Sequence, residues 1–193
     1  MRFAYADPPY LGCARMYTKH HPDAMIWDDP ETHRRLIERL SDEYPDGWAL
    51  SLHVPSLQTM LAMCPPDVRV GAACKTFGQI RPTAVQWMWE PVIFRGGRKG
   101  PQTPLVRDWL TYNTAPRSSA RDGGLIGGKP MAFCMWVFSL LGAERGDTLD
   151  DLFPGTGAVS AAWAAFNAAP LDMPLLPLDA AADSGHQTGV SLT

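Results

Sequence analysis

Short apolar segments alternate with helix-like segments along most of this 193-residue chain, and this alternation restricts the fold more than any other feature. The strand-like segments are residues 2–6, 47–54, 68–74, 84–94 and 147–153. The helix-like segments are residues 28–44, 56–63, 130–142 and 157–169, with one or two further helical turns at 105–112. Strands that alternate with helices are typical of an α/β sheet. We therefore predict one α/β domain in which helices pack against a sheet.

The composition indicates a single globular domain. Hydrophobic residues make up 46% of the chain and charged residues 19%, a balance typical of folded proteins. No apolar stretch approaches the roughly 20 residues of a membrane-spanning helix. The first residues lack the basic start and apolar run of a signal peptide, so we expect a cytoplasmic protein. The four cysteines are scattered and His20 and His21 have no partner at ligand spacing, so we expect no metal site.

Basic residues are concentrated between residues 95 and 129, although the whole chain carries a net charge of −3. Seven basic residues in this segment stand against two acidic ones, Asp108 and Asp122. The basic residues are Arg95, Arg98, Lys99, Arg107, Arg117, Arg121 and Lys129. Such a segment can bind phosphates or can be a solvated loop, and charge alone does not separate the two. Trp109 and Tyr112 in the same segment can contact a nucleic acid or form a small core under the loop.

A glycine turn joins the last strand-like segment to the last helix-like segment, in the sequence DLFPGTGAV (residues 151–159). Gly155 and Gly157 carry no Cβ, so the backbone there can approach a ligand closely. The start of the following helix offers free N–H groups and a positive dipole end to an anionic group. The turn lacks the third glycine of a dinucleotide fingerprint and the Gly-Lys-Ser/Thr of a phosphate loop. Similar turns bind S-adenosylmethionine or only connect elements, so this motif alone does not name a ligand.

The sequence Asp7-Pro8-Pro9-Tyr10 follows the first strand-like segment directly. Two successive prolines end a strand and leave the backbone little torsional freedom, which fixes the carboxylate and the phenol ring on either side. Taken alone, the sequence also fits a tight turn in which the aspartate accepts a hydrogen bond from a nearby backbone N–H. Its meaning therefore depends on the motifs found further along the chain.

Three motifs occur in the order ADPPY (residues 6–10), GGKP (127–130) and DLFPGTG (151–157). Together they resemble the amino-methyltransferases that methylate exocyclic amines of DNA bases, most often N6 of adenine. The motif that would hold the target amine (ADPPY) precedes the motif that would bind the cofactor (DLFPGTG). This order is similar to that of the permuted class of the family. QWMWEPVIFRGG (86–97) also resembles the strand before the family's target-recognition segment. The resemblance implies a Rossmann-like methyltransferase fold, with a mostly parallel sheet flanked by helices.

The resemblance also implies a domain layout and a set of site residues. The methyltransferase domain would cover residues 1–167, with residues 95–128 inserted as the target-recognition segment and residues 168–193 as a flexible tail. The residues that hold the target amine would be Asp7, Pro8, Pro9 and Tyr10. The residues of the S-adenosylmethionine site would be Lys129, Pro130, Asp151, Phe153, Pro154, Gly155, Thr156 and Gly157. The residues that contact DNA would be Arg95, Arg98, Lys99, Arg107, Arg117 and Arg121.

The chemistry of such a reaction explains these residue types. Adenine N6 is a poor nucleophile because its lone pair is delocalised into the ring, and two acceptors aimed at its N–H bonds would stabilise the developing positive charge. The Asp7 carboxylate would be one acceptor and the backbone carbonyl of Pro8 the other. Tyr10 would stack on a base that has left the duplex. Because the methyl group sits on a sulfonium, positioning does most of the work and no metal is required.

The sequence departs from the family after the last helix-like segment. Members usually continue into a second strand that ends in an acidic residue for the cofactor ribose. Here the chain continues as NAAPLDMPLLPLDAAAD, without a clear strand. Asp172 and Asp179 in this stretch are the acidic residues that could bind the ribose instead. The cofactor would then bind weakly, or a partner subunit would complete the site, or the protein would be inactive. We expect a monomer or a homodimer.

Three functions remain open at this point. The first is methylation of adenine N6 in DNA. The second is the same chemistry on RNA adenine, on cytosine N4 or on a protein amide. The third is a non-catalytic nucleic-acid-binding subunit that has kept the fold. Aspartate at the first position of the Asp7-to-Tyr10 motif favours adenine, because the family's cytosine enzymes more often have serine there.

Overall fold

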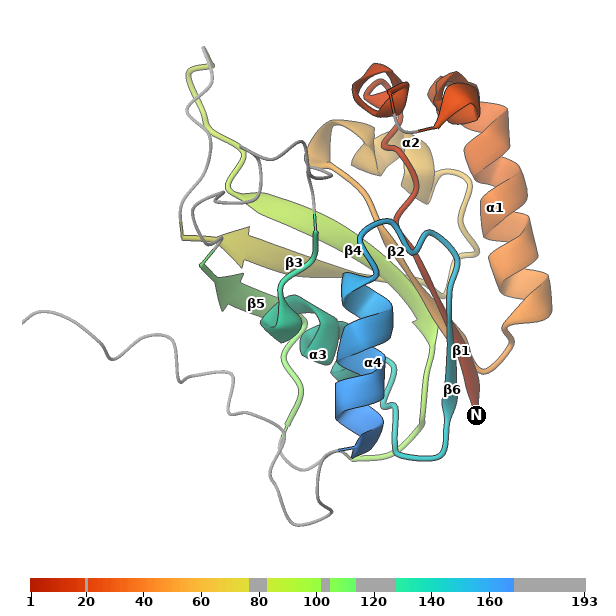
Figure 1. Ribbon diagram of the computed structural model, residues 1–193, viewed down its shortest axis with the longest axis vertical. Coiled ribbons are helices and arrows are strands. Elements are labelled where there is room, and N and C mark those ends of the chain that lie inside the picture. The colour runs from red at the N-terminus through yellow and green to blue at the C-terminus, as the bar shows by residue number, and fades with distance from the viewer. Residues whose placement is uncertain (20, 77–82, 102–104, 114–127, 169–193) are drawn as a thin grey trace, which may run out of the picture.

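The computed structural model describes residues 1–19, 21–76, 83–101, 105–113 and 128–168 and shows a six-stranded sheet with helices on both faces (Figure 1). The strands are β1 (Arg2–Ala6), β2 (Gly47–Ser51), β3 (Arg69–Lys75), β4 (Trp89–Gly96), β5 (Trp109–Tyr112) and β6 (Thr148–Asp151). Their order across the sheet is β5-β3-β4-β2-β1-β6. The first and the last of these strands in the sequence are therefore neighbours in space.

The sheet is mostly parallel, as predicted. β1 pairs in parallel with β2 and with β6, and β3 pairs in parallel with β5. β4 lies between β2 and β3 and runs antiparallel to both. All strands except β4 therefore place their carboxyl ends at the same edge of the sheet. That edge is where ligands bind in open α/β sheets.

Two layers of helices cover the sheet. The α-helices are α1 (Pro30–Glu43), α2 (Leu57–Leu61), α3 (Met131–Leu140) and α4 (Ala158–Ala168), and the 3₁₀ helices are η1 (Ala14–Tyr17), η2 (Pro22–Asp28) and η3 (Val54–Ser56). α1 and α2 pack on the face that carries Ala4 and Ala6, whereas α3 and α4 pack on the face that carries Phe3 and Tyr5 (Figure 1). Alternate residues of β1 thus enter the two cores. None of the helices in the described residues is both long and apolar enough to span a membrane.

The local sequence explains why α1 forms where it does. The Asp29 side chain accepts a hydrogen bond from the backbone N–H of Glu31 at 3.0 Å, and Pro30 occupies the first turn. Both features favour a helix start. The buried face of the helix consists of His33, Leu36, Ile37 and Leu40. α1 therefore covers the sheet and carries the chain from β1 to β2.

Two segments differ from the prediction. The sequence predicts helical turns at residues 105–112, but Trp109–Tyr112 form strand β5, in which Leu110 and Tyr112 are buried. This two-residue alternation fits the edge of the sheet, where β5 pairs with β3, so tertiary pairing outweighs the local helical tendency. β4 begins at Trp89 rather than at residue 84, and Trp87 before it is 51% exposed. The predicted flexible tail, apart from Ala168, lies outside the described residues.

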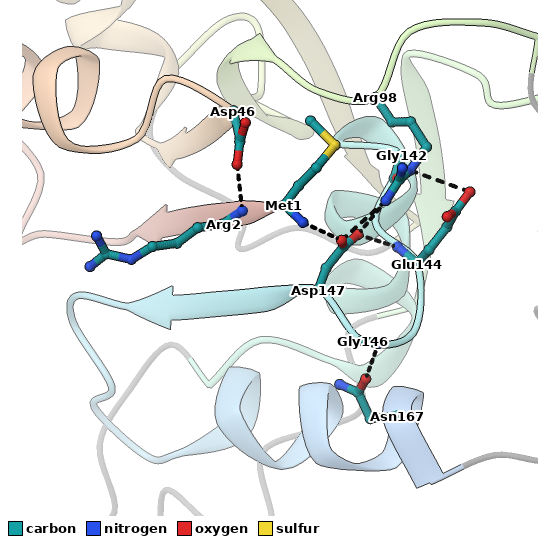
Figure 2. A network of polar contacts seen from close by, with 9 residues as sticks. All are labelled: Met1, Arg2, Asp46, Arg98, Gly142, Glu144, Gly146, Asp147 and Asn167. Carbon is teal, nitrogen blue, oxygen red and sulfur yellow. Dashed lines mark hydrogen bonds and ion pairs between the residues drawn. The ribbon is translucent and has the colours of Figure 1, made fainter.

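A polar network holds the sheet together at the edge opposite the carboxyl ends (Figure 2). Asp147 lies just before β6, and its side chain is only 6% exposed. It accepts hydrogen bonds from the Met1 amino group at 2.6 Å, from the Arg98 guanidinium at 2.8 Å and from the Glu144 amide at 2.8 Å. Burial alone would raise the pKa of Asp147, but these three donors outweigh it and hold the pKa below its ordinary value.

We expect Asp147→Asn to lower the free energy of unfolding by about 2 kcal/mol at pH 7, because the variant loses a carboxylate that satisfies several donors. Since folding lowers the pKa of Asp147, its contribution is complete above the ordinary carboxyl pKa of about 4 and is lost as the pH falls through the folded-state value. Urea denaturation at pH 7 and at pH 3 measures this, and the difference from wild type should shrink at pH 3.

Asp108→Asn is the matched control, because it removes an exposed ion pair with Arg69. It should change the free energy of unfolding by less than about 0.5 kcal/mol. Equal effects of the two substitutions at pH 7 would contradict a structural role for the Asp147 network.

Candidate active site

The two neighbouring strands β1 and β6 send the chain to opposite faces of the sheet. After β1 the chain continues to α1 on one face, and after β6 it continues to α4 on the other. A crevice forms outside the carboxyl ends of two such strands, at what is called a topological switch point. Tyr5 pairs with Asp151 across the two strands, so Asp7 and Phe153 both follow at this edge. The fold thus brings together two motifs that lie far apart in the sequence.

A cavity of about 500 Å³ occupies this position. Asp7 and Pro9 line it from the end of β1, and Phe153, Pro154, Gly155 and Thr156 line it from the glycine turn. The wall facing these motifs comes from the segment that contains η1 and η2, with Tyr17, His21, Pro22, Asp23, Ala24, Ile26 and Trp27. Gly128 and Lys129 line the cavity from the segment before α3. The volume is within the range of small-molecule sites.

Asp7, Tyr10 and Lys129 form a cluster beside the cavity. The Tyr10 hydroxyl donates to Asp7 Oδ1 at 3.1 Å, and Lys129 Nζ donates to the Tyr10 oxygen at 3.0 Å. Lys129 Nζ also lies 3.2 Å from Asp7 Oδ1, and its side chain is 9% exposed. Both contacts of Asp7 use Oδ1, so among the described residues Oδ2 stays available to another donor.

Two further charged residues extend this cluster along the sheet. Glu90 Oε2 lies 3.7 Å from Lys129 Nζ, and Glu90 Oε1 accepts a hydrogen bond from Lys75 Nζ. Neither residue is predicted from the sequence. Glu90 is a single acidic residue at the start of an apolar strand, and Lys75 ends another strand, so neither belongs to a recognisable local pattern. The register of β3 and β4 is what places them together.

The charges in this cluster shift one another's titration. Burial would lower the pKa of Lys129, but Asp7, Tyr5 and Glu90 outweigh it and raise the pKa well above its ordinary value. Burial raises the pKa of Asp7, and the Lys129 ammonium opposes this rise. Burial would raise the pKa of Glu90, but Lys129 and Lys75 hold it below its ordinary value. Lys129 is therefore a permanent cation between two carboxylates.

Tyr10 remains a neutral phenol in this environment. Burial raises its pKa well above the ordinary value, and the charges of Asp7 and Glu90 raise it further. Its ring stacks on His53 with a centroid distance of 5.6 Å and an interplanar angle of 10°. His53 Nδ1 in turn lies 3.0 Å from Ser56 Oγ. His53 is a third residue near the site, after Glu90 and Lys75, that the sequence does not predict.

The glycine turn adopts the backbone conformation that its residues predict. Gly155 has φ +49° and Gly157 has φ +76°, values that residues with a side chain rarely adopt. The Gly157 N–H donates to the Pro154 carbonyl at 2.6 Å, and α4 begins at Ala158. The positive φ values favour glycine at both positions, and of the two glycines it is Gly155 that lines the cavity.

Polar and aromatic groups surround the turn. The Asp151 carboxyl accepts from Ser160 Oγ at 3.2 Å through Oδ2, while Oδ1 is buried with no hydrogen-bond partner in the described part of the chain. Burial raises the pKa of Asp151. Phe153 packs edge-on against Trp27 with a centroid distance of 5.1 Å. Pro130 precedes α3, and its carbonyl accepts from the Cys134 N–H at 3.1 Å, so it starts the helix rather than lining the cavity.

The fold occurs in solved structures. One is the crystal structure of the M1.HpyAVI–SAM complex, which superposes with a TM-score of 0.50 over 86% of this chain and 78% of that one, at 12% sequence identity. This confirms the predicted fold class, a Rossmann-like methyltransferase fold. No protein-family model and no curated protein sequence matches the chain.

None of the predicted DNA-contacting residues within the described ranges lines the cavity. β4 is antiparallel, so Arg95 near its end lies at the opposite edge of the sheet, where it pairs with Asp67 at 2.8 Å. Arg98 pairs with Asp147 at that same edge (Figure 2). Lys99 follows in the same loop and is exposed. Arg117 and Arg121 lie outside the described residues.

The remaining candidates in this segment divide between surface and core. The Arg107 guanidinium lies over the Trp109 ring, 5.3 Å from its centroid, and Trp109 is 47% exposed. Tyr112 is buried against Phe133, so it belongs to the core rather than to a nucleic-acid surface. Within the described ranges, no group of three His, Cys, Asp or Glu side chains is placed to bind a metal.

Proposed function

We propose that the protein transfers a methyl group from S-adenosylmethionine to the exocyclic N6 amine of adenine in DNA. The observation that carries this proposal is one cavity, at the carboxyl ends of β1 and β6, that both Asp7 and the Gly155 turn line. Methyl transfer needs its two reactants in line and in contact, so a shared cavity is its first geometric requirement. The M1.HpyAVI–SAM complex has the same fold, which supports the choice of cofactor.

The residues around the glycine turn fit S-adenosylmethionine. The cofactor has amine and hydroxyl donors, an aromatic base and a compact backbone end. The buried Asp151 Oδ1 lacks a donor in the described part of the chain, and Phe153 and Trp27 offer apolar ring surface. Gly155 and the start of α4 allow close approach of the ligand to the main chain. When bound, S-adenosylmethionine supplies an electrophilic methyl group on a sulfonium.

The residues at the end of β1 would prepare the amine. Asp7 Oδ2 accepts one amine N–H, and the Pro8 carbonyl, fixed by the ring of Pro9, accepts the other. These contacts direct the nitrogen lone pair towards the cofactor side of the cavity and stabilise the positive charge that develops on nitrogen. The Asp7 carboxylate is also the nearest base for the proton that the methylated amine releases. Tyr10 offers its ring to the flipped base.

The nucleic-acid partner follows from the same chemistry. Adenine N6 inside a duplex cannot reach a cavity lined by Asp7, so the base must flip out of the stack. Lys99, Arg107, Arg117 and Arg121 stay as proposed contacts to the DNA backbone. Arg95 and Arg98 leave this set, because each is paired with a carboxylate at the edge of the sheet opposite the cavity. The cytoplasmic location and the monomeric or homodimeric state stay predictions.

Incubation of the purified protein with labelled S-adenosylmethionine and unmethylated DNA tests the proposal. After digestion, mass spectrometry should detect N6-methyladenine. Label on RNA but not on DNA would point to the RNA alternative, and N4-methylcytosine would point to the cytosine alternative. If no substrate takes label and calorimetry detects no binding of S-adenosylmethionine, the fold serves a non-catalytic role and the proposal is rejected.

Asp23 is a further candidate for the cofactor ribose. Its carboxylate lines the cavity from η2 and makes no hydrogen bond or ion pair with the described residues. A free carboxylate is the acceptor that a vicinal diol requires, so we expect Asp23→Asn to weaken S-adenosylmethionine binding about 5- to 20-fold in calorimetry. Asp42→Asn on the exposed face of α1 is the control and should leave the affinity unchanged. An unchanged affinity in Asp23→Asn would assign the ribose to other residues.

A further inference from the structure

We propose that Glu90 and Lys75 are positioning residues for the reaction, because they hold the Lys129 ammonium in the place where it orients Asp7 and Tyr10. This inference rests on the proposed methyl transfer, and it adds two residues that lie outside the Asp-Pro-Pro-Tyr and glycine motifs. Neither of the two lines the cavity. Their effect on the amine would therefore pass through Lys129.

The geometry that carries the proposal is a row of four alternating charges. Lys75 at the end of β3 bonds Glu90 on β4, Glu90 lies 3.7 Å from Lys129, and Lys129 lies 3.2 Å from Asp7 at the end of β1. The exposed fractions of these side chains are 25%, 22%, 9% and 22% in the same order. The row contains two cations and two anions, so its net charge is zero. Partly buried charges need such pairing, because an unpaired buried charge is strongly destabilising.

The strands fix the row in space. β3 and β4 are antiparallel, and Ala73 pairs with Glu90 and Cys74 with Trp89. Lys75 and Glu90 are therefore diagonal neighbours on adjacent strands, and the sheet fixes the backbone of both. Lys129, in contrast, lies in the short segment before α3, with no strand to hold its side chain. The rings of Tyr10 and Phe133 also face its ammonium, with centroids 5.6 Å and 5.2 Å away. Glu90 therefore connects Lys129, which lies outside the sheet, to strand β4.

The position of Lys129 matters because it has several acceptors. Its ammonium contacts Asp7, the Tyr10 oxygen and Glu90. Glu90 keeps part of the positive charge away from Asp7, so that Asp7 can still accept a hydrogen bond from the substrate amine. Without the Glu90 carboxylate, Lys129 would bind Asp7 more tightly and compete with the amine for it.

The two residues affect the Asp7 carboxyl in opposite directions. The positive charge of Lys129 lowers the pKa of Asp7, and the negative charge of Glu90 raises it. In the described part of the chain, other titratable groups that interact with Asp7 include Tyr5, Tyr10, Tyr17, Tyr112, Cys134 and Asp151. The tyrosines and Cys134 have raised pKa values and stay neutral between pH 5 and pH 8. Their effect on the pKa of Asp7 should therefore be the same whether or not Glu90 or Lys129 is replaced. Opposite shifts are therefore expected from removing the two charges.

The pH dependence of kcat in Glu90→Gln and Lys129→Met tests the proposal. Glu90→Gln should lower kcat about 10-fold and move the acid limb to lower pH by about 0.5 to 1 unit. Lys129→Met should lower kcat about 100-fold and move the acid limb to higher pH. The dissociation constant of S-adenosylmethionine should stay within about 3-fold of wild type in Glu90→Gln, because Glu90 does not line the cavity. Lys75→Met should also lower kcat, but by less than Lys129→Met does.

Glu31→Gln is the matched control, because Glu31 pairs with Arg34 and Arg35 on the surface of α1. It should leave kcat and its pH profile unchanged. A merely structural role for Glu90 would lower stability and kcat without moving the acid limb. An acid limb that stays in place, or that moves in the same direction in both variants, overturns the proposal.

A second measurement separates this proposal from the proposed function. Carboxyl-selective ¹³C NMR titration reports the pKa of Asp7 without any turnover, with Asp7→Asn to assign the signal. Opposite shifts of this pKa in Glu90→Gln and Lys129→Met would support the positioning role even in a protein that methylates none of the tested substrates. Activity in wild type together with unshifted pKa values would uphold the methyltransferase and reject the positioning role.

Discussion

Asp7→Asn is expected to lower the rate of methyl transfer by about 10² to 10³-fold while S-adenosylmethionine binds within about 3-fold of wild type. Asparagine has nearly the shape of aspartate, so the contacts to Tyr10 and Lys129 can persist through its amide oxygen. The remaining position, that of Oδ2, becomes an NH₂ group. It presents a donor to the amine N–H where an acceptor is needed, and the negative charge that stabilises the developing cation is gone. Single-turnover kinetics with saturating DNA measures the loss directly.

The control for this experiment is Asp150→Asn. Asp150 lies on β6 and pairs with Arg2 at 2.6 Å and with Tyr44 at 2.8 Å, so this variant also loses a paired carboxylate. Arg2 begins β1 and Tyr44 precedes β2, so both partners lie toward the edge of the sheet opposite the cavity, and Asp150 is not among the lining residues. Its rate should stay within about 2-fold of wild type. If Asp7→Asn were as active as Asp150→Asn, the mechanism assigned to Asp7 would have to be abandoned.

The strands that build the site could be predicted because their sequences are locally informative. Residues 2–6 form β1 and residues 148–151 form β6 inside the predicted segments, and the glycine turn and the helix after it follow as expected. That β1 and β6 are neighbours is a different matter. Some 140 residues separate them, and nothing in their own periodicity selects one partner strand over another. The resemblance carried by the motifs, rather than the hydrophobic pattern, is what implied that the residues after these two strands belong to one site.

The roles of the basic residues between 95 and 129, in contrast, could not be predicted from their local sequence. Counting basic residues between 95 and 129 treats neighbours in sequence as neighbours in space. Because β4 is antiparallel, its end lies at the opposite edge of the sheet, and Asp67 and Asp147 neutralise Arg95 and Arg98 there. Both acids come from other parts of the chain. A local charge count therefore cannot tell a phosphate-binding surface from a set of structural ion pairs.

The supporting residues of the site were not predictable for the same reason. Glu90, Lys75 and His53 each stand alone in their local sequence and match no motif. They reach Lys129 and Tyr10 only through the pairing of β3 with β4 and through the chain direction after β2. Residues that contact a reacting group directly tend to belong to motifs. Those that hold the first set in place depend on the register of the sheet, which a single sequence does not specify.

Gly155→Val is expected to weaken S-adenosylmethionine binding at least about 50-fold. Gly155 lines the cavity with φ +49°, and a β-branched side chain strongly disfavours this backbone conformation. There is space for the added Cβ, since among the described residues only the Phe153 carbonyl lies within 4 Å of it, at 3.7 Å. The chain can therefore still fold, but the turn must change shape. The N–H groups at the start of α4 would no longer meet the ligand, and the valine would occupy part of the cavity. Calorimetry with S-adenosylmethionine measures the loss.

Gly146→Val is the control that distinguishes lost cofactor binding from a general effect of backbone strain on stability. Gly146 has φ +89°, and no atom of the residues that the structure describes lies within 4 Å of an added Cβ. Valine there therefore meets a similar conformational penalty without a steric clash with those residues. It lies before β6, at the edge of the sheet opposite the cavity (Figure 2). Both variants should lose about 1 to 2 kcal/mol of stability, yet only Gly155→Val should lose cofactor binding. If the two variants bound S-adenosylmethionine equally well, the glycine turn would not be the cofactor site, and a methyl donor would have to approach Asp7 from another side.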